Sequence, residues 1–229
     1  MRLDRFVSQC SGLSRKAVKI ALRAGRISVN AHREASASLI LKATDEVLLD
    51  NRVLHLPSAR YLMLHKPAGV ICATEDPAHQ CVIDLLPAEL AKGLKVAGRL
   101  DIDTTGLVLL TDDGDWNHRL TSPRRACPKV YEVTTADPIA PDTVARFAEG
   151  LLLKSETKPT RPAELTLIAA NRAQLVLHEG RYHQAKRMFA AVGNRVTALH
   201  RSAIGNIQLD PQLNPGDYRS LTATEVASV

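Results

Sequence analysis

The sequence predicts an α+β protein of two domains, and three features of its 229 residues lead to this prediction. Helical and strand patterns alternate along the chain without an internal repeat. Pro57 and Ser58 lie between two apolar segments and indicate a linker over residues 56–60. Residues 1–55 hold ten Lys or Arg against five Asp or Glu, whereas the rest of the chain holds twenty against nineteen. A small basic domain (1–55) is therefore expected before a larger, nearly neutral one (61–229).

The composition excludes several classes of protein. Hydrophobic residues make up 45% of the chain, which is enough for a substantial core. The four cysteines are scattered without a CxxC pair, so neither a zinc site nor a disulfide framework is expected. No apolar run reaches the ~20 residues of a membrane span. The first ten residues lack the apolar centre of a signal peptide. We therefore expect a cytoplasmic protein that binds no membrane and no metal.

The first domain begins with two amphipathic helices. Leu3, Phe6, Val7 and Cys10 follow helical spacing, and Ser14 is a good N-cap for a second helix that runs to Ala24. The basic residues of the second helix lie on one face, and they are Arg15, Lys16, Lys19 and Arg23. Arg26, just after the helix, extends this basic face.

This basic face predicts a phosphate-binding surface. Residues 1–26 hold seven basic residues, and Asp4 is the only acidic one, so the charge exceeds what a merely solvated face needs. An anionic membrane is the weaker alternative, because no Trp or Phe lies on the apolar side of this helix to anchor in lipid. Strand patterns follow at Ile27–Val29 and Glu46–Leu49.

The second domain alternates strands and helices. The patterns predict strands at 61–64, 107–110, 130–133, 165–168, 174–177 and 196–199, and helices at 116–120, 142–149 and 185–192. The strands at 165–168 and 174–177 are expected to pair with one another across Asn171 and Arg172.

A polar loop precedes the most apolar strand of the chain. Arg99, Asp101, Asp103 and Thr104 lie directly before Leu107–Leu110. A carboxylate on a loop beside a buried strand is held rigidly and still exposed to a substrate, so it is a candidate for chemistry. The alternative is a polar turn in which Asp101 or Asp103 caps its own backbone.

A second polar stretch lies at the start of the last predicted helix. It holds six potential hydrogen-bond donors within seven positions, and a helix N-terminus lined with donors favours anions. The alternative is an exposed, solvated first turn. The donors are Arg181, Tyr182, His183, Gln184, Lys186 and Arg187.

Four ordered motifs resemble those of the RsuA/RluA superfamily of pseudouridine synthases. They are Lys66-Pro67-Ala68-Gly69, Gly98 to Leu107, Lys129-Val130-Tyr131 and Gly180 to Arg187. The resemblance implies a catalytic domain built on a mixed, mostly antiparallel sheet flanked by helices.

The first domain resembles the S4 RNA-binding domain, a small α/β module, over about 50 residues. The matching residues are 1–4, 14–16 and 25–30. The match departs at Ala31, where Gly is usual, so we expect a different hairpin turn that includes His32 and Arg33. In the second domain, His65 replaces the usual Asn before Lys66-Pro67.

The resemblance implies the isomerisation of one uridine to pseudouridine without a cofactor. Details of the motifs are similar to members that act on the small ribosomal subunit, which implies uridine 516 of 16S rRNA as the target. By the same resemblance Asp101 is the catalytic carboxylate, Lys186 its cationic partner and Tyr131 the residue that stacks on the uracil. Arg99 contacts a phosphate or fills the space that the flipped base leaves. Thr104 and the donors at 181–184 and 187 are expected to bind RNA.

The expected partner is 16S rRNA or the assembling small subunit, bound by a monomer. Three other functions stay open on the sequence. They are the same reaction on a large-subunit uridine, a non-enzymatic ribosome-assembly factor, and a glycoside-type hydrolase that uses Asp101 and Asp103 as its carboxylate pair.

Overall fold

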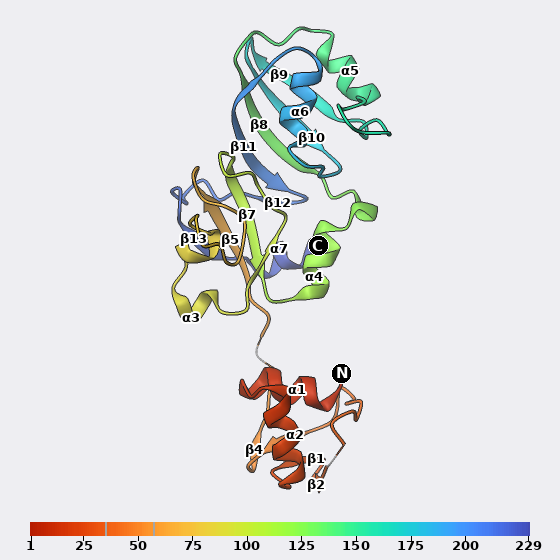
Figure 1. The fold of residues 1–229 in the computed structure, drawn as a ribbon, viewed down its shortest axis with the longest axis vertical. Helices are drawn as coiled ribbons and strands as arrows, with labels where there is room; N and C mark the ends of the chain where they lie inside the picture. The colour runs from red at the N-terminus through yellow and green to blue at the C-terminus, as the bar shows by residue number, and fades with distance from the viewer. Residues whose placement is uncertain (35, 57) are drawn as a thin grey trace. The chain divides into compact units, whose positions relative to one another are not determined.

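The computed structural model describes residues 1–34, 36–56 and 58–229, which form two compact units, 1–58 and 59–229 (Figure 1). Pro57, on which the expected linker rests, lies outside the described residues. No helix in the described ranges is both long and apolar enough to cross a membrane.

The first unit contains two helices and a small sheet. Helix α1 (Leu3–Ser11) ends at Gly12 in the left-handed conformation, and the Ser14 side chain caps α2 (Arg15–Arg23) by accepting a hydrogen bond from the Ala17 amide. The strands are β1 (Ile27–Val29), β2 (His32–Arg33), β3 (Val47–Leu49) and β4 (Arg52–Val53), which pair antiparallel in the order β2-β1-β3-β4. The helices and strands predicted here are confirmed.

The expected place of His32 and Arg33 in the hairpin turn is wrong. His32 and Arg33 form strand β2 opposite Val29 and Ser28, and the two-residue turn consists of Asn30 and Ala31. Both turn residues have positive φ, 52° and 67°, as a type I′ turn demands. Ala31 therefore adopts a left-handed backbone conformation, which Gly would adopt without strain. The twist of the flanking strands requires this turn, and this requirement outweighs the preference of Ala for negative φ.

The second unit is built on one mixed sheet. Its main strands are β5 (Tyr61–Lys66), β7 (Thr105–Thr111), β8 (Lys129–Thr135), β9 (Glu164–Ala169), β10 (Arg172–Leu177), β11 (Val196–Ile204) and β13 (Tyr218–Ser220). They lie in the order β13-β5-β7-β11-β8-β10-β9, and β6 (Lys95–Ala97) and β12 (Ile207–Gln208) pair with β7 and β11. Among the described strands of this sheet, β7–β11 is the one parallel pair, so the expected mixed, mostly antiparallel sheet is confirmed.

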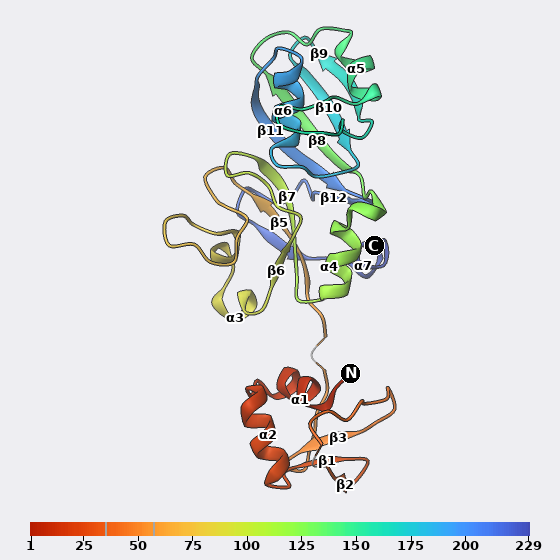
Figure 2. The ribbon, with the colours of Figure 1, turned by 45° about the vertical axis from the view of Figure 1, so that its right-hand side comes forward.

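Helices cover both faces of this sheet (Figure 2). Helices α5 (Thr143–Glu149) and α6 (Gln184–Ala191) pack through Phe147, Met188 and Phe189 on one face. On the other face, α4 (Gly114–Thr121) and α7 (Ala223–Ala227) enclose Trp116 and Leu120, and the Trp116 indole donates to the Val226 carbonyl. The sequence pattern does not predict α7. Short helices η1 (Val82–Leu85), α3 (Ala88–Ala91) and η2 (Pro123–Arg125) complete the unit.

Strand β7 explains why the sequence signal is strongest at Leu107–Leu110. Leu107 and Leu109 pack on one face of the sheet and Val108 and Leu110 on the other, and all four are fully buried. A strand covered on both faces is apolar at every position, which is the pattern that the sequence shows. The polar loop before β7 is thereby attached to the most buried part of the sheet.

Candidate functional site

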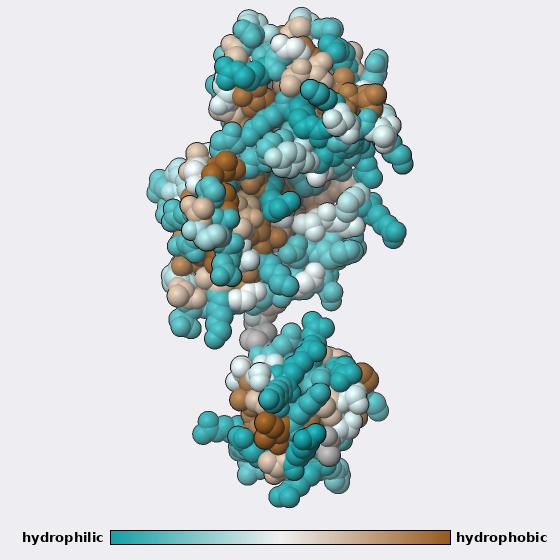
Figure 3. Space-filling view, viewed as in Figure 1, coloured by the Kyte–Doolittle hydropathy of each residue, from teal (hydrophilic) through white to brown (hydrophobic). Residues whose placement is uncertain are grey.

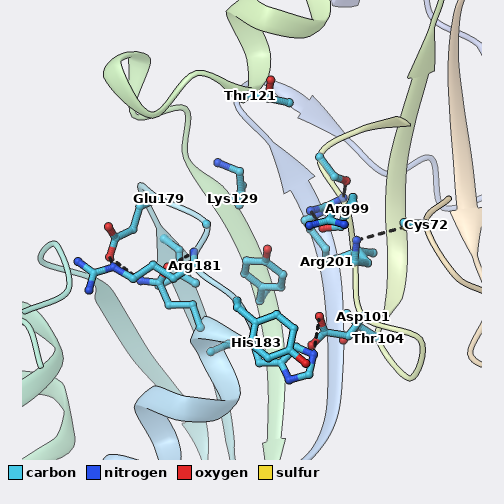
Figure 4. Close-up of a pocket in the computed structure, with 18 of the residues that line it drawn as sticks. Cys72, Arg99, Asp101, Thr104, Thr121, Lys129, Glu179, Arg181, His183 and Arg201 are labelled. Atoms are coloured by element: carbon cyan, nitrogen blue, oxygen red, sulfur yellow. Dashed lines mark hydrogen bonds and ion pairs between the residues drawn. The ribbon is translucent and has the colours of Figure 1, made fainter. Parts of the chain in front are cut away.

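Asp101 lies in the loop between β6 and β7, beside a cavity of about 740 Å³. The cavity is bounded by this loop, by Lys129 and Tyr131 on β8, and by the segment 177–185 that leads into α6. The Asp101 side chain is 25% exposed, so it is held by protein contacts and still open to a ligand. Figure 4 shows the side chains of Asp101 and His183 pointing toward one another and in contact at the cavity.

Lys186 joins helix α6 to the polar loop. Its Nζ lies 3.0 Å from Oδ2 of Asp101 and 2.6 Å from Oδ1 of Asp103. Burial opposes the charged ammonium, but the hydrogen bonds to Asp103 and Asp101 outweigh it and raise the pKa of Lys186. The hydrogen bond from Lys186 likewise lowers the pKa of Asp103. The Lys186–Asp103 pair, which links α6 to the loop, is therefore ionised at neutral pH. The expected proximity of Lys186 to Asp101 is also present.

Two buried cations fix the backbone of the loop. The Arg201 guanidinium donates to the carbonyls of Gly98, Arg99 and Leu107, at 2.8, 3.3 and 2.9 Å. The Lys66 ammonium donates to the carbonyls of Pro67, Ile102 and Thr104, at 2.9, 3.1 and 2.7 Å.

These two side chains are 1% and 0% exposed, so backbone carbonyl dipoles rather than water stabilise each charge. Burial lowers the pKa of Lys66. Asp101 stands between the two clamped ends of the loop, which explains how an irregular segment holds a carboxylate in one place.

Gly106 allows the parallel pairing that brings Arg201 to the loop. Its φ is 107°, and a Cβ atom added there would lie 2.3 Å from the Arg201 carbonyl oxygen. Only glycine fits so close an approach of β7 and β11.

Tyr131 lines the same cavity from strand β8, where it pairs with Arg201 of β11 and is 8% exposed. Arg99 also lines the cavity, next to the Arg201 guanidinium (Figure 4). Thr104 is 1% exposed, and its hydroxyl has no hydrogen-bond partner among the residues that the structure describes. Its buried position does not favour the direct RNA contact that the sequence suggests.

Most of the donors expected to bind an anion at the start of α6 have partners within the protein. Arg181 and Arg187 both pair with Glu156 at 2.8 Å, and Arg187 also donates to the Lys154 carbonyl. The Gln184 side chain accepts from the Arg181 amide and donates to Glu179. Hydrogen bonds from Arg187 and Arg181 lower the pKa of Glu156, though burial opposes the shift. These residues therefore attach the segment before β9 to helix α6.

Tyr182 and His183 differ from Arg181 and Gln184, which also line the cavity, because their rings pack on one another. Their rings stack with centroids 3.8 Å apart and planes 20° apart, and His183 Nε2 lies 3.5 Å from Asp101 Oδ1. His183 has a left-handed backbone, with φ 46° and ψ 39°.

Sequence reasoning missed two positioning groups, Arg201 and Lys66, although Lys66 belongs to a recognised motif. A signal exists for both, since each lies two residues after the last apolar residue of a predicted strand, Leu64 or Leu199, and so continues its buried face, where a charge needs a partner. His200, the neighbour of Arg201, hydrogen-bonds to the Thr105 hydroxyl at 2.9 Å and packs edge-on against His65. Burial lowers the pKa of His200.

The basic residues expected on the first unit are all exposed, and one of them, Arg26, forms a salt bridge. Arg15, Lys16, Lys19 and Arg23 form no salt bridge with any described residue. Arg26 instead forms a two-pronged pair with Asp50, in which Nε lies 2.8 Å from Oδ1. Ile20 of the same helix is 58% exposed rather than packed. Figure 3 shows hydrophilic side chains over much of this unit.

Comparisons with known proteins show the family of this chain. The RNA pseudouridylate synthase family matches residues 60–191. The chain is 51% identical to ribosomal small subunit pseudouridine synthase A of Yersinia pestis, over 100% of this chain and 98% of that one. It is 49% identical to the protein of the same name from Escherichia coli K12, over 100% of both.

A solved structure described as a pseudouridylate synthase is 43% identical, with a TM-score of 0.74 over 100% of this chain and 99% of that chain. With the family match, the full-length relatives and the shared fold, the chain belongs to the RNA pseudouridylate synthase family.

Proposed function

We propose that this enzyme isomerises uridine 516 of 16S rRNA to pseudouridine, with Asp101 as the catalytic carboxylate. The observation that carries the proposal is the Asp101–Lys186 pair at a cavity that Tyr131 also lines. The names of the full-length relatives support the small ribosomal subunit as the substrate. Asp101, Tyr131 and Lys186 all come from one chain, so a monomer would suffice for the reaction, and we propose that it acts on rRNA in the cytoplasm.

The reaction breaks the N1–C1′ bond, turns the uracil in place and joins C5 to C1′. The uridine has to leave its stack before a side chain can reach C1′. Asp101 then acts at C1′ or C2′ of the ribose, as nucleophile or as base. The Lys186 ammonium pairs with the carboxylate at 3.0 Å, and the loop clamped by Lys66 and Arg201 keeps Asp101 in place while the base turns.

Tyr131 is proposed to stack on the uracil and to assist removal of the C5 proton. Its near-complete burial in strand β8 gives the ring one fixed orientation in the cavity. Arg99, on the Asp101 loop, is proposed to contact a flanking phosphate or to fill the space left by the base. The first unit is proposed to act as an S4-like module that binds folded RNA through the exposed cations of α2.

Mapping pseudouridines in rRNA from cells with and without this protein tests the proposal. We expect one modified position in 16S rRNA to depend on the protein and to be restored by the wild-type chain but not by Asp101→Asn. A dependent position in large-subunit RNA would overturn the target. Restoration by Asp101→Asn would overturn the assignment of the carboxylate, and full rRNA modification in cells without the protein would favour an assembly factor.

A further inference from the structure

Tyr182 is unusual among the aromatic side chains of the protein because it faces solvent. Its exposure is 76%, whereas every other Phe, Tyr or Trp in the described ranges is buried or half-buried. It lies at the cavity that holds Asp101, together with Ile102, which is 42% exposed. The rim of this cavity therefore exposes one aromatic and one aliphatic side chain.

The Tyr182 ring is held in place from one side only. The His183 imidazole covers one of its faces, with 3.8 Å between the ring centroids. His183 is in turn tied to Asp101 by the 3.5 Å contact of Nε2 with Oδ1. Since the ring is nevertheless 76% exposed, its second face is open to solvent. The result is a two-layer stack whose inner ring contacts the carboxylate and whose outer ring is free.

A free aromatic face beside an extruded nucleotide is suited to bind a neighbouring nucleobase by stacking. When a uridine leaves its stack, the base next to it loses a stacking neighbour. Unpaired RNA bases are bound by stacking on aromatic side chains, and every base has a π-face that serves. The contacts of 3.8 and 3.5 Å place the Tyr182 ring within reach of the nucleotide adjacent to the one whose ribose meets Asp101.

We propose that Tyr182, backed by His183, is the platform on which the nucleobase adjacent to the target uridine stacks. This inference rests on the proposed function, because it needs an extruded uridine at Asp101. It adds a recognition element in which the substrate is bound through two consecutive bases. The target base enters the cavity, and its neighbour continues the Tyr182–His183 stack at the rim.

The test compares side chains of similar size with and without a π-face. Full-length wild type, Tyr182→Phe and Tyr182→Leu are assayed on a 16S rRNA fragment that contains the target. A second fragment carries 2-aminopurine next to the target, and its fluorescence is followed on binding in an Asp101→Asn background that prevents turnover. Ile168→Ala, which truncates an exposed apolar residue outside the cavity lining, is the control.

We expect Tyr182→Phe to keep the 2-aminopurine quenching and the wild-type KM. Tyr182→Leu should lose the quenching and bind about 5- to 150-fold more weakly, with KM changing more than kcat. Equal quenching and KM for the Leu and Phe variants would overturn the inference. A fall in kcat with KM and quenching unchanged would also overturn it, because Tyr182 would then act only through His183. Absence of wild-type turnover on this fragment would count instead against the proposed target.

Discussion

Lys186 places its ammonium 3.0 Å from Asp101 and 2.6 Å from Asp103, although the two carboxylates differ in their surroundings. The Asp101 side chain is 25% exposed and lines the cavity, whereas that of Asp103 is 66% exposed. One cation thus serves an inner and an outer carboxylate. Only the inner one lines the cavity, so the proposed chemistry is assigned to Asp101 and not to Asp103.

The first prediction uses the two carboxylates as a matched pair. Asp101→Asn should lower kcat by about 10⁴-fold, because the amide cannot act as nucleophile or base. Asp103→Asn should lower it by less than about tenfold, since Lys186 keeps its pairing with Asp101. Single-turnover pseudouridine formation on a 16S rRNA fragment measures both. Equal losses would show that the outer carboxylate shares the chemistry.

The second prediction concerns the cation. Lys186→Met should lower kcat by about 10²- to 10³-fold, because Asp101 loses the ammonium that lies 3.0 Å from its Oδ2. Lys186→Arg should stay within about tenfold of wild type, since a guanidinium keeps the charge and can bridge both carboxylates. The same single-turnover assay applies, with RNA binding measured separately. An active Met variant would remove Lys186 from the mechanism.

The third prediction concerns the buried clamp. Lys66→Met leaves the carbonyls of Pro67, Ile102 and Thr104 without their donor and should lower the free energy of unfolding by about 2–4 kcal/mol. Lys95→Met removes an exposed lysine from β6 and should change it by less than about 0.5 kcal/mol. Denaturant unfolding measures both changes. Similar losses would mean that the carbonyls find other donors.

The fourth prediction separates two basic residues of the first unit. If Lys19 contacts a phosphate, Lys19→Ala should reduce the slope of log Kd against log salt by about 0.7–0.9. Arg26→Ala should change the slope much less, because Arg26 is already paired with Asp50. Titrations of an rRNA fragment at several salt concentrations provide the slopes. Identical slopes for the Lys19 variant and the wild type would exclude a contact there.

The fifth prediction is a pH dependence at the C-terminal helix. Hydrogen bonds from Arg219 and the Thr222 amide, opposed by burial, lower the pKa of Glu225 from 4.5 to about 2. A lowered folded pKa stabilises the protein above about pH 4.5, and this stabilisation disappears as the pH falls toward 2.

Glu225→Gln should therefore cost about 1–3 kcal/mol at pH 7, and the cost should shrink progressively below pH 4.5. Glu89→Gln, which removes an exposed carboxylate, is the control. Unfolding free energies from pH 7 downward measure the effect. A cost for Glu225→Gln that did not change with pH would contradict the assigned ion pair.

The sequence by itself determined most of the secondary structure and the order of the motifs. Strand β7 was predictable because burial on both faces makes every position apolar, and α2 because Ser14, its apolar spacing and Gly25 act locally. The loop that holds Asp101 stood out because polar residues adjoin that strand. Such signals lie within a few residues of one another, so no fold is needed to see them.

Only the tertiary structure decided which polar residues face a ligand and which hold the protein together. Arg181, Arg187 and Arg26 are indistinguishable in sequence from substrate-binding cations. In the structure, however, Arg181 and Arg187 form salt bridges with Glu156, and Arg26 forms one with Asp50. Lys66 and Arg201 reach loop carbonyls 36 and 103 residues away in sequence. The pairing of a charge depends on where the sheet brings distant strands together, and no local pattern contains that information.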